Sequence, residues 1–213
     1  MSGDPVDLVI RGGLVVDGSG GEPFEADVAV SGGRIVELAK DGARLHGRDE
    51  IDARGHIVTP GFVDPHTHYD GQVTWDNRLG PSSGHGVTTA IMGNCGVGFA
   101  PCRADEQDIM IRLMEGVEDI PHPVLAAGLP WTWESFPEYL DALETLPHDI
   151  DFAAYVPHAP LRVYVMGERA LRQEVATAED HARMADLLKQ GMAAGALGFG
   201  TSQTIIHRSS DGE

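Results

Sequence analysis

The chain has 213 residues, of which 42% are hydrophobic and 23% charged, so it is long enough to bury a sizeable core and its composition is that of a globular protein. Its 15 basic and 33 acidic residues give a net charge of −18, which argues against binding to nucleic acid or to an anionic membrane surface. The sequence shows neither a signal peptide nor about 18 consecutive apolar residues, so we expect a soluble cytoplasmic protein.

The first part of the chain has the pattern of short strands joined by tight turns. Two β-branched runs flank Gly12-Gly13, and a similar pair flanks Gly32-Gly33, a spacing that suits two-residue hairpins with positive φ. We therefore predict a small antiparallel sheet over residues 6–57. About 50 residues of hairpin seldom stand alone, so the apolar face of this sheet needs a partner.

The stretch TPGFVDPHTHYD, residues 59–70, contains two histidines separated by one residue. If residues 61–66 form a strand that runs on to His68, then His66 and His68 point to the same face, because side chains alternate along a strand. Two imidazoles on one face can bind zinc or a similar divalent ion, and Asp64 is a candidate to orient one of them. His-x-His alone is a weak signal, since two solvated loop histidines give the same pattern.

A second β-run, VTTAIM at residues 87–92, ends in the turn Gly-Asn-Cys-Gly. It places Cys95 just beyond the C-terminal end of a strand, where parallel α/β barrels carry their active sites. A thiolate binds zinc tightly, whereas the alternative is a buried, inert cysteine in a glycine-rich turn. Cys102 follows Pro101 in a predicted loop, and we interpret it as structural. Two cysteines cannot form a disulfide framework.

Three helices are predicted in the second part of the chain. Apolar residues at helical spacing indicate one over residues 105–118. Another starts at or near Ser135. A third covers residues 177–194, with Thr177 as N-cap and Asp180 three residues later, as in a capping box.

Two further strands are predicted, one over residues 151–158, which ends at the candidate pocket residue His158, and one over residues 195–200. Trp131 and Trp133 are expected to pack a loop onto the rim of the domain rather than to line a substrate channel. The alternation of strands and helices after residue 60 predicts a parallel sheet with right-handed crossovers, and a parallel barrel is the leading architecture.

Several stretches together resemble the amidohydrolase superfamily and, more closely, its D-aminoacylase branch: GFVDPHTHYD, HGVTTAIMGNCGVGFAPC, MEGVEDIP, LRVYVMGERA and AGALGFGTS. The resemblance implies an α/β fold, with about four strands of a partial (β/α)8 TIM barrel over residues 59–213. It implies that residues 1–58 are a small antiparallel β-sandwich subdomain completed by the C-terminal end of the chain. It also implies that His66, His68 and Cys95 are ligands of Zn²⁺.

For the complete protein, the resemblance implies hydrolysis of the amide bond of a small molecule, an N-acyl-D-amino acid, which releases a D-amino acid and a carboxylate. Two alternatives remain open. One is a cyclic-amide hydrolase of the dihydroorotase or dihydropyrimidinase kind, over which Cys95 favours the deacylase. The other is a non-catalytic amidohydrolase-like scaffold, against which the intact pair His66 and His68 argues.

Two departures from the family pattern are visible. The chain reads GTSQTIIH where the family has Ser-Thr-Gly-Leu followed by a tyrosine, so Ile205 stands near the tyrosine position and no residue is assigned to the substrate. Because an eight-stranded barrel takes about 250 residues, the family's catalytic aspartate is expected beyond Glu213. This polypeptide is expected to be inactive, with His158 and His207 as spare groups, and its open sheet edge favours self-association.

Overall fold

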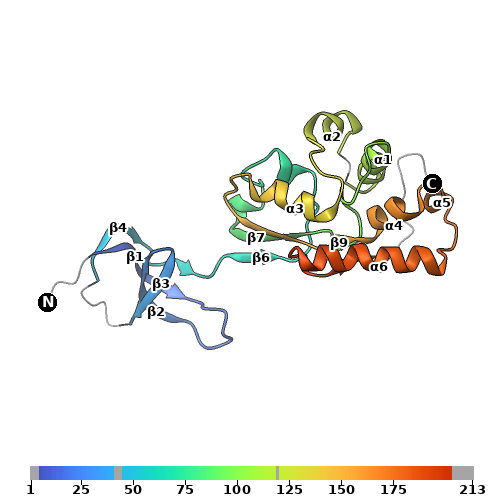
Figure 1. Ribbon diagram of the computed structural model, residues 1–213. Helices are drawn as coiled ribbons and strands as arrows, with labels where there is room; N and C mark the ends of the chain where they lie inside the picture. The colour runs from blue at the N-terminus through green and yellow to red at the C-terminus, as the bar shows by residue number, and fades with distance from the viewer. Residues whose placement is uncertain (1–4, 41–44, 119, 203–213) are drawn as a thin grey trace. The chain divides into compact units, whose positions relative to one another are not determined.

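The computed structural model describes residues 5–40, 45–118 and 120–202. The chain divides into two compact units, Met1–Gly61 and Phe62–Glu213 (Figure 1). The second unit thus starts at residue 62, close to the predicted start at residue 59. Two residues named from the sequence, Ile205 and His207, lie outside the described residues.

The first unit contains one mixed sheet of five strands. β1 (Val6–Val15) pairs antiparallel with β2 (Phe24–Ser31), which pairs antiparallel with β3 (Arg34–Ala39). β4 (Gly47–Asp52) and β5 (Ile57–Val58) both pair with β1 in parallel. The prediction of a purely antiparallel sheet is therefore wrong, because the chain crosses over before β4 instead of turning back in a hairpin. The second layer of a β-sandwich stays a prediction.

Of the two predicted glycine hairpins, one is confirmed. Gly32 and Gly33 join β2 to β3 with φ of +58° and +72°. The hairpin at Gly12-Gly13 is wrong, because β1 runs through both glycines and the positive φ of Gly12 accompanies a shift of register instead of a reversal. Gly13 allows close packing, since a Cβ there would lie 2.4 Å from Cγ2 of Val58.

All described strands of the second unit pair in parallel. β6 (Phe62–Asp64), β7 (Val87–Met92) and β8 (Asp151–Ala154) form one sheet in that order, and β9 (Val156–Pro157) pairs with β10 (Phe199–Gly200). This pairing confirms the predicted parallel sheet, while the right-handed crossovers and the barrel stay predictions.

Two strand predictions need correction. The predicted strand over residues 151–158 is divided at Tyr155, because β8 pairs with β7 up to Ala154, whereas β9 pairs with β10 from Val156 onward. Its last residue, His158, begins a helix instead of ending the strand. The strand predicted over residues 195–200 is only two residues long, because the chain before it is still leaving the preceding helix.

Six helices accompany these strands in the described part of the second unit (Figure 1). They are α1 (Gln107–Glu118), α2 (His122–Gly128), α3 (Phe136–Glu144), α4 (His158–Met166), α5 (Glu168–Leu171) and α6 (Ala178–Ala193). None of the described helices is both long enough and apolar enough to cross a membrane. Three helices, α2, α4 and the four-residue α5, were not predicted from the sequence. Both α2 and α4 have a proline in their first turn, a position that a helix tolerates but that indicates a loop when only the sequence is considered.

Helix starts at α3 and α6 follow from local sequence. Ser135 and Glu138 form a full capping box at α3, and Thr177 and Asp180 form another at α6. In each, the hydroxyl accepts a backbone N–H from the first turn and the carboxylate accepts the N–H of the cap residue. Both predicted starts are confirmed.

The core of the second unit includes an aromatic cluster beside α3. Trp133 is buried and its Nε1–H donates to the carbonyl of Phe99 at 2.9 Å, while Trp131 meets the Phe99 ring edge-on at 5.8 Å. Tyr139 packs against Trp133 with ring centroids 5.0 Å apart. The two tryptophans therefore pack a loop against the core of the second unit, and their place at the rim of the domain stays a prediction.

Candidate metal centre

The two histidines lie in a loop just after β6. The prediction that a strand carries both is wrong, since β6 ends at Asp64. Pro65 has no backbone N–H to offer to a sheet, and the carboxylate of Asp64 accepts the backbone N–H of His66 at 3.2 Å. The chain therefore turns out of the sheet before it reaches His66 and His68.

This loop is hydrogen-bonded to the end of β7. The backbone N–H and the hydroxyl of Thr67 both donate to the carbonyl of Ile91, at 2.8 and 2.9 Å. The side-chain amide of Asn94 donates to the carbonyl of Pro65 at 2.9 Å. Cys95 follows Asn94 directly, so these bonds bring the histidine loop against the turn that carries the thiol.

His66, His68 and Cys95 meet at the C-terminal ends of β6 and β7. One ligand atom from each lies within 4.8 Å of the others, and Sγ of Cys95 is 3.8 Å from both ring nitrogens of His68. The two imidazole centroids are 5.3 Å apart. His66 is exposed, His68 is half-buried and Cys95 is buried, so the group opens to solvent on the histidine side. Within the described residues, no other group of three such side chains is as close.

The donor set fits a zinc ion. Bond lengths of about 2.0–2.3 Å in a tetrahedron place neighbouring ligand atoms about 3.3–3.6 Å apart, slightly less than the separations here. Sγ is equally far from both nitrogens of His68, so the distance to the thiol does not distinguish which nitrogen would be the ligand. Thiolate and imidazole favour zinc over magnesium or calcium, which prefer oxygen.

A depression of about 330 Å³ lies beside the histidines. Its walls include Tyr69, whose hydroxyl donates to Oγ of Ser82 at 2.7 Å. Gln72 also lines it and is held in place by the carboxylate of Asp76 at 2.7 Å, a bond that lowers the pKa of Asp76. Tyr69, Gln72 and Ser82 were not predicted from the sequence, in which only Tyr69 and Gln72 are near His68.

His158 lies outside this group. It starts α4, its Nδ1 is 3.2 Å from the hydroxyl of Thr201, and its ring meets Phe199 with centroids 5.6 Å apart. Burial, followed by the charge of Arg162, lowers the pKa of His158, so the imidazole is neutral at neutral pH. Its role as a pocket residue stays a prediction.

The second cysteine has a different environment. Cys102 is buried, its Sγ lies 3.4 Å from the carbonyl of Arg103, and burial raises its pKa to about 12. The thiol therefore stays protonated at neutral pH, which agrees with the structural role predicted for it.

Comparison with known proteins places these features in a family. Residues 49–212 match the model of the amidohydrolase family. D-aminoacylase from Alcaligenes xylosoxydans xylosoxydans is 36% identical over 198 residues, which cover 92% of this chain and 38% of that protein. A structure of D-aminoacylase, described as having a binuclear metal centre, gives a TM-score of 0.78 at 32% identity and covers 98% of this chain and 41% of its own.

N-acyl-D-glutamate deacylase from Bordetella bronchiseptica, in complex with zinc and a phosphonate inhibitor, gives a TM-score of 0.75 at 29% identity, over 99% of this chain and 40% of that one. The chain thus spans about two fifths of the length of these relatives. The structural matches confirm the predicted mixed α/β fold. Because the family model covers most of the chain and the sequence similarity nearly all of it, this chain belongs to the amidohydrolase family.

Proposed function

We propose that this chain is part of a zinc-dependent amide hydrolase that acts on N-acyl-D-amino acids and releases a D-amino acid and a carboxylate. The observation that carries the proposal is the convergence of His66, His68 and Cys95 within 4.8 Å at the ends of two parallel strands. The substrate class is supported by the relatives, which are named D-aminoacylase, N-acyl-D-aspartate deacylase and N-acyl-D-glutamate deacylase.

His66, His68 and Cys95 would hold the zinc ion. Bound zinc supplies a Lewis acid that polarises an amide carbonyl and favours ionisation of water. The residues of this chain orient the ligands, since the loop that carries the two histidines is tied to β7. The depression lined by Tyr69 and Ser82 leaves room for a small molecule on the open side of the histidines.

The remaining machinery is proposed to lie elsewhere in the protein. Since the chain spans about two fifths of its relatives, we place the further metal ligands and the aspartate that carries the proton outside these 213 residues. The 213-residue polypeptide alone would then bind metal without turnover, because hydrolysis needs a base within hydrogen-bond reach of the reacting water. A TIM barrel, of which β6 to β10 are the first strands, is the architecture we propose for the whole.

The two cysteines provide a matched test in the full-length protein. Zinc content and hydrolysis of N-acetyl-D-methionine and N-acetyl-D-glutamate are measured for the wild type, Cys95→Ala and Cys102→Ala. We expect Cys95→Ala to weaken zinc binding by more than about 100-fold and to abolish hydrolysis, because a ligand is lost. Cys102→Ala should retain both zinc binding and hydrolysis, provided that circular dichroism shows an intact fold.

Other outcomes separate the alternatives. Hydrolysis of dihydroorotate in place of the N-acyl-D-amino acids would favour a cyclic-amide hydrolase. A wild-type protein that binds no zinc and hydrolyses none of these substrates would favour a non-catalytic scaffold. Equal zinc affinity in wild type and Cys95→Ala would contradict the ligand assignment itself.

A further inference from the structure

The residue between the two histidines, Thr67, is more deeply buried than either of them. Thr67 is 7% exposed, whereas His66 is exposed and His68 half-buried. Its backbone N–H and its hydroxyl donate to the same carbonyl, that of Ile91, at 2.8 and 2.9 Å. A carbonyl oxygen has two lone pairs, so it can accept both bonds. Fixing the residue in the middle limits the positions of both imidazoles.

The acceptor of these bonds, the carbonyl of Ile91, lies on the central strand of the three-stranded sheet. Ile91 is in β7, which pairs with β6 on one side and with β8 on the other, where Ile91 is opposite Ala153. Cys95 follows four residues later on the same chain. The hydroxyl of Thr67 therefore connects the histidine loop to the strand from which the cysteine turn extends.

The side chain of Asn94 makes a second connection between the two segments, in the opposite direction. Asn94, next to Cys95, donates its amide N–H to the carbonyl of Pro65, next to His66, at 2.9 Å. One bond thus runs from the histidine loop to β7, and the other from the cysteine turn back to the histidine loop. We call Thr67 and Asn94, with their two acceptor carbonyls on Ile91 and Pro65, the interloop clamp.

We propose that Thr67 and Asn94 are positioning residues, and that the interloop clamp holds His66 and His68 at metal-sharing distance from Cys95. This inference rests on the proposed function, because it assumes that the three side chains share an ion. Neither clamp side chain needs to touch the metal. Hydrogen bonds that orient the ligands of a metal typically change its affinity by about 10–100-fold when they are removed.

Three threonine substitutions test the clamp in the full-length protein. Thr67→Val keeps the shape of the side chain and the backbone bond to Ile91 but removes the hydroxyl bond. Thr67→Ser keeps a hydroxyl at the same place. Thr88→Val makes the same chemical change at an exposed position of β7 and serves as the matched control. Asn94→Ala removes the second bond at a half-exposed site, where loss of the fold is not expected.

The probe is Co²⁺, added to metal-free protein, because a cobalt–thiolate bond produces a charge-transfer absorption that reports on Cys95. We expect Thr67→Val to weaken Co²⁺ binding by about 10-fold and to reduce this band, while the Tm of the metal-free protein changes little. Asn94→Ala should show a smaller loss in the same direction, since its bond is open to solvent. Thr67→Ser should restore most of the affinity, and Thr88→Val should match the wild type.

The outcomes distinguish the clamp from the metal site itself. If the wild type shows no cobalt–thiolate band, the proposed function fails at the ligand set. If the wild type shows the band and both Thr67→Val and Asn94→Ala match it in affinity and intensity, the clamp is overturned while the metal site stands. A loss that Thr67→Ser does not restore also overturns it, because the hydroxyl is then not the group that matters.

Discussion

The two units of this protein are stabilised in different ways. The second unit buries one large apolar cluster drawn from α1, α2, α3, α4 and β7, in which Leu125 and Leu143 are almost completely buried. The first unit has a small cluster of Val15, Ala26 and Val28. A few partly buried side chains pack against this cluster, and the sheet also carries ion pairs. Large buried cores make a unit rigid, so the second unit is the one suited to hold side chains at fixed distances.

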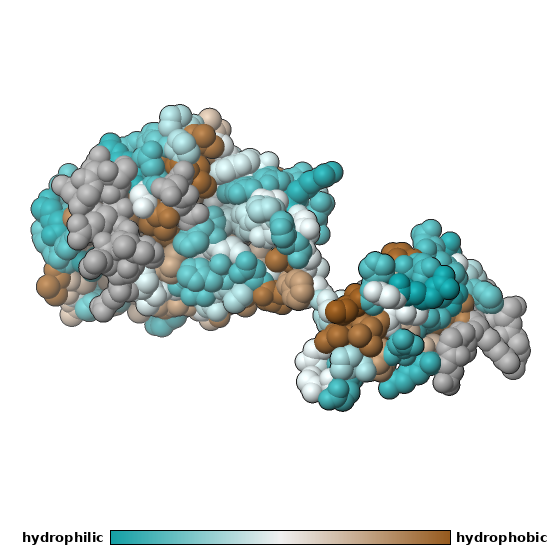
Figure 2. Space-filling view, turned by 180° about the vertical axis from the view of Figure 1, so that it is seen from behind, coloured by the Kyte–Doolittle hydropathy of each residue, from teal (hydrophilic) through white to brown (hydrophobic). Residues whose placement is uncertain are grey.

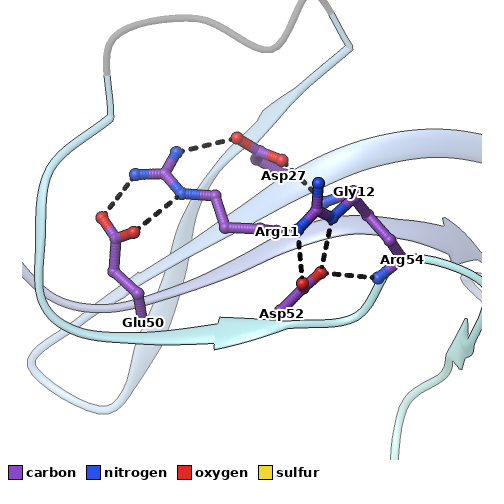
Figure 3. Close-up of a pocket in the computed structure, with 6 residues that line it drawn as sticks. All are labelled: Arg11, Gly12, Asp27, Glu50, Asp52 and Arg54. Atoms are coloured by element: carbon purple, nitrogen blue, oxygen red, sulfur yellow. Dashed lines mark hydrogen bonds and ion pairs between the residues drawn. The ribbon is translucent and has the colours of Figure 1, made fainter.

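The ion pairs of the first unit line a pocket on its sheet (Figure 3). The guanidinium of Arg11 lies between the carboxylates of Asp27 and Glu50, and that of Arg54 pairs with Asp52. Hydrogen bonds to Glu50 and Asp27 raise the pKa of Arg11 above its ordinary value. Arg11 thus joins β1 to β2 and to β4, whereas the exposed pair of Arg54 and Asp52 lies within one short segment and joins no strands.

The opposite face of that sheet is apolar and partly uncovered. Leu38, Val28, Ile10 and Ile51 lie opposite one another across four strands, which places them on one face. Of these, Leu38 and Ile51 are exposed, and so is Ile35 nearby. Figure 2 shows hydrophobic residues gathered on this smaller unit. Among the described residues of the first unit, this face therefore carries exposed apolar side chains that a partner would stabilise by covering them.

The largest expected effect is the loss of stability caused by a cavity in the core of the second unit. Leu143→Ala in α3, at a position 1% exposed, should lower the free energy of unfolding by about 2–5 kcal/mol. The matched change in the first unit, Ile51→Ala at a position 52% exposed, should cost less than about 1 kcal/mol. Urea denaturation followed by tryptophan fluorescence and circular dichroism measures both. Equal losses would show that the face of the first unit is as well covered as the core of the second.

A smaller effect concerns association of the 213-residue polypeptide. We expect it to self-associate through the apolar face of the first unit, with a second copy as the covering layer. The double variant Ile35→Lys, Ile51→Lys should shift the sedimentation profile toward the monomer, because charged side chains resist burial. Val175→Lys, at an isolated exposed position in the second unit, is the control. Association that survives the double variant would point to the open edge of the parallel sheet instead.

The smallest effect is electrostatic and lies at the start of α6. A hydrogen bond from Arg169, with further bonds from Thr177, holds the pKa of Asp180 well below its ordinary value. A lowered pKa means that the ionised group stabilises the fold above its unfolded-state pKa of about 4, and that this contribution disappears as the pH falls further. Asp180→Asn should therefore lower Tm at pH 7 and make Tm less sensitive to acid between about pH 5 and pH 2.

Asp186→Asn on the same helix is the control for that experiment. Asp186 pairs with Lys189 on the exposed surface, so its removal should leave the acid dependence nearly unchanged. If Asp180→Asn and Asp186→Asn gave the same pH profile, the capping box and the Arg169 pair would contribute nothing particular to stability.

Short-range features were predictable from the sequence because their causes lie within a few residues. The capping residues Ser135 and Thr177 determine their helix starts by bonds to the next turn, and β7 was predicted with the residues it has. The predictions were wrong where pairing with a distant segment determines the local structure. β1 passes through Gly12-Gly13 because β2, β4 and β5 pair with both of its halves.

The same distinction between local and long-range causes applies to the candidate metal centre. Sequence by itself determined which side chains are available, since His66, His68 and Cys95 follow two strand signals and parallel strands end at one edge. Tertiary structure alone decided that the histidines leave the sheet after Asp64 and still come within reach of a thiol 27 residues away from His68. That distance depends on the register of β6 against β7 and on the bonds from Thr67 and Asn94, which join segments that no local pattern relates.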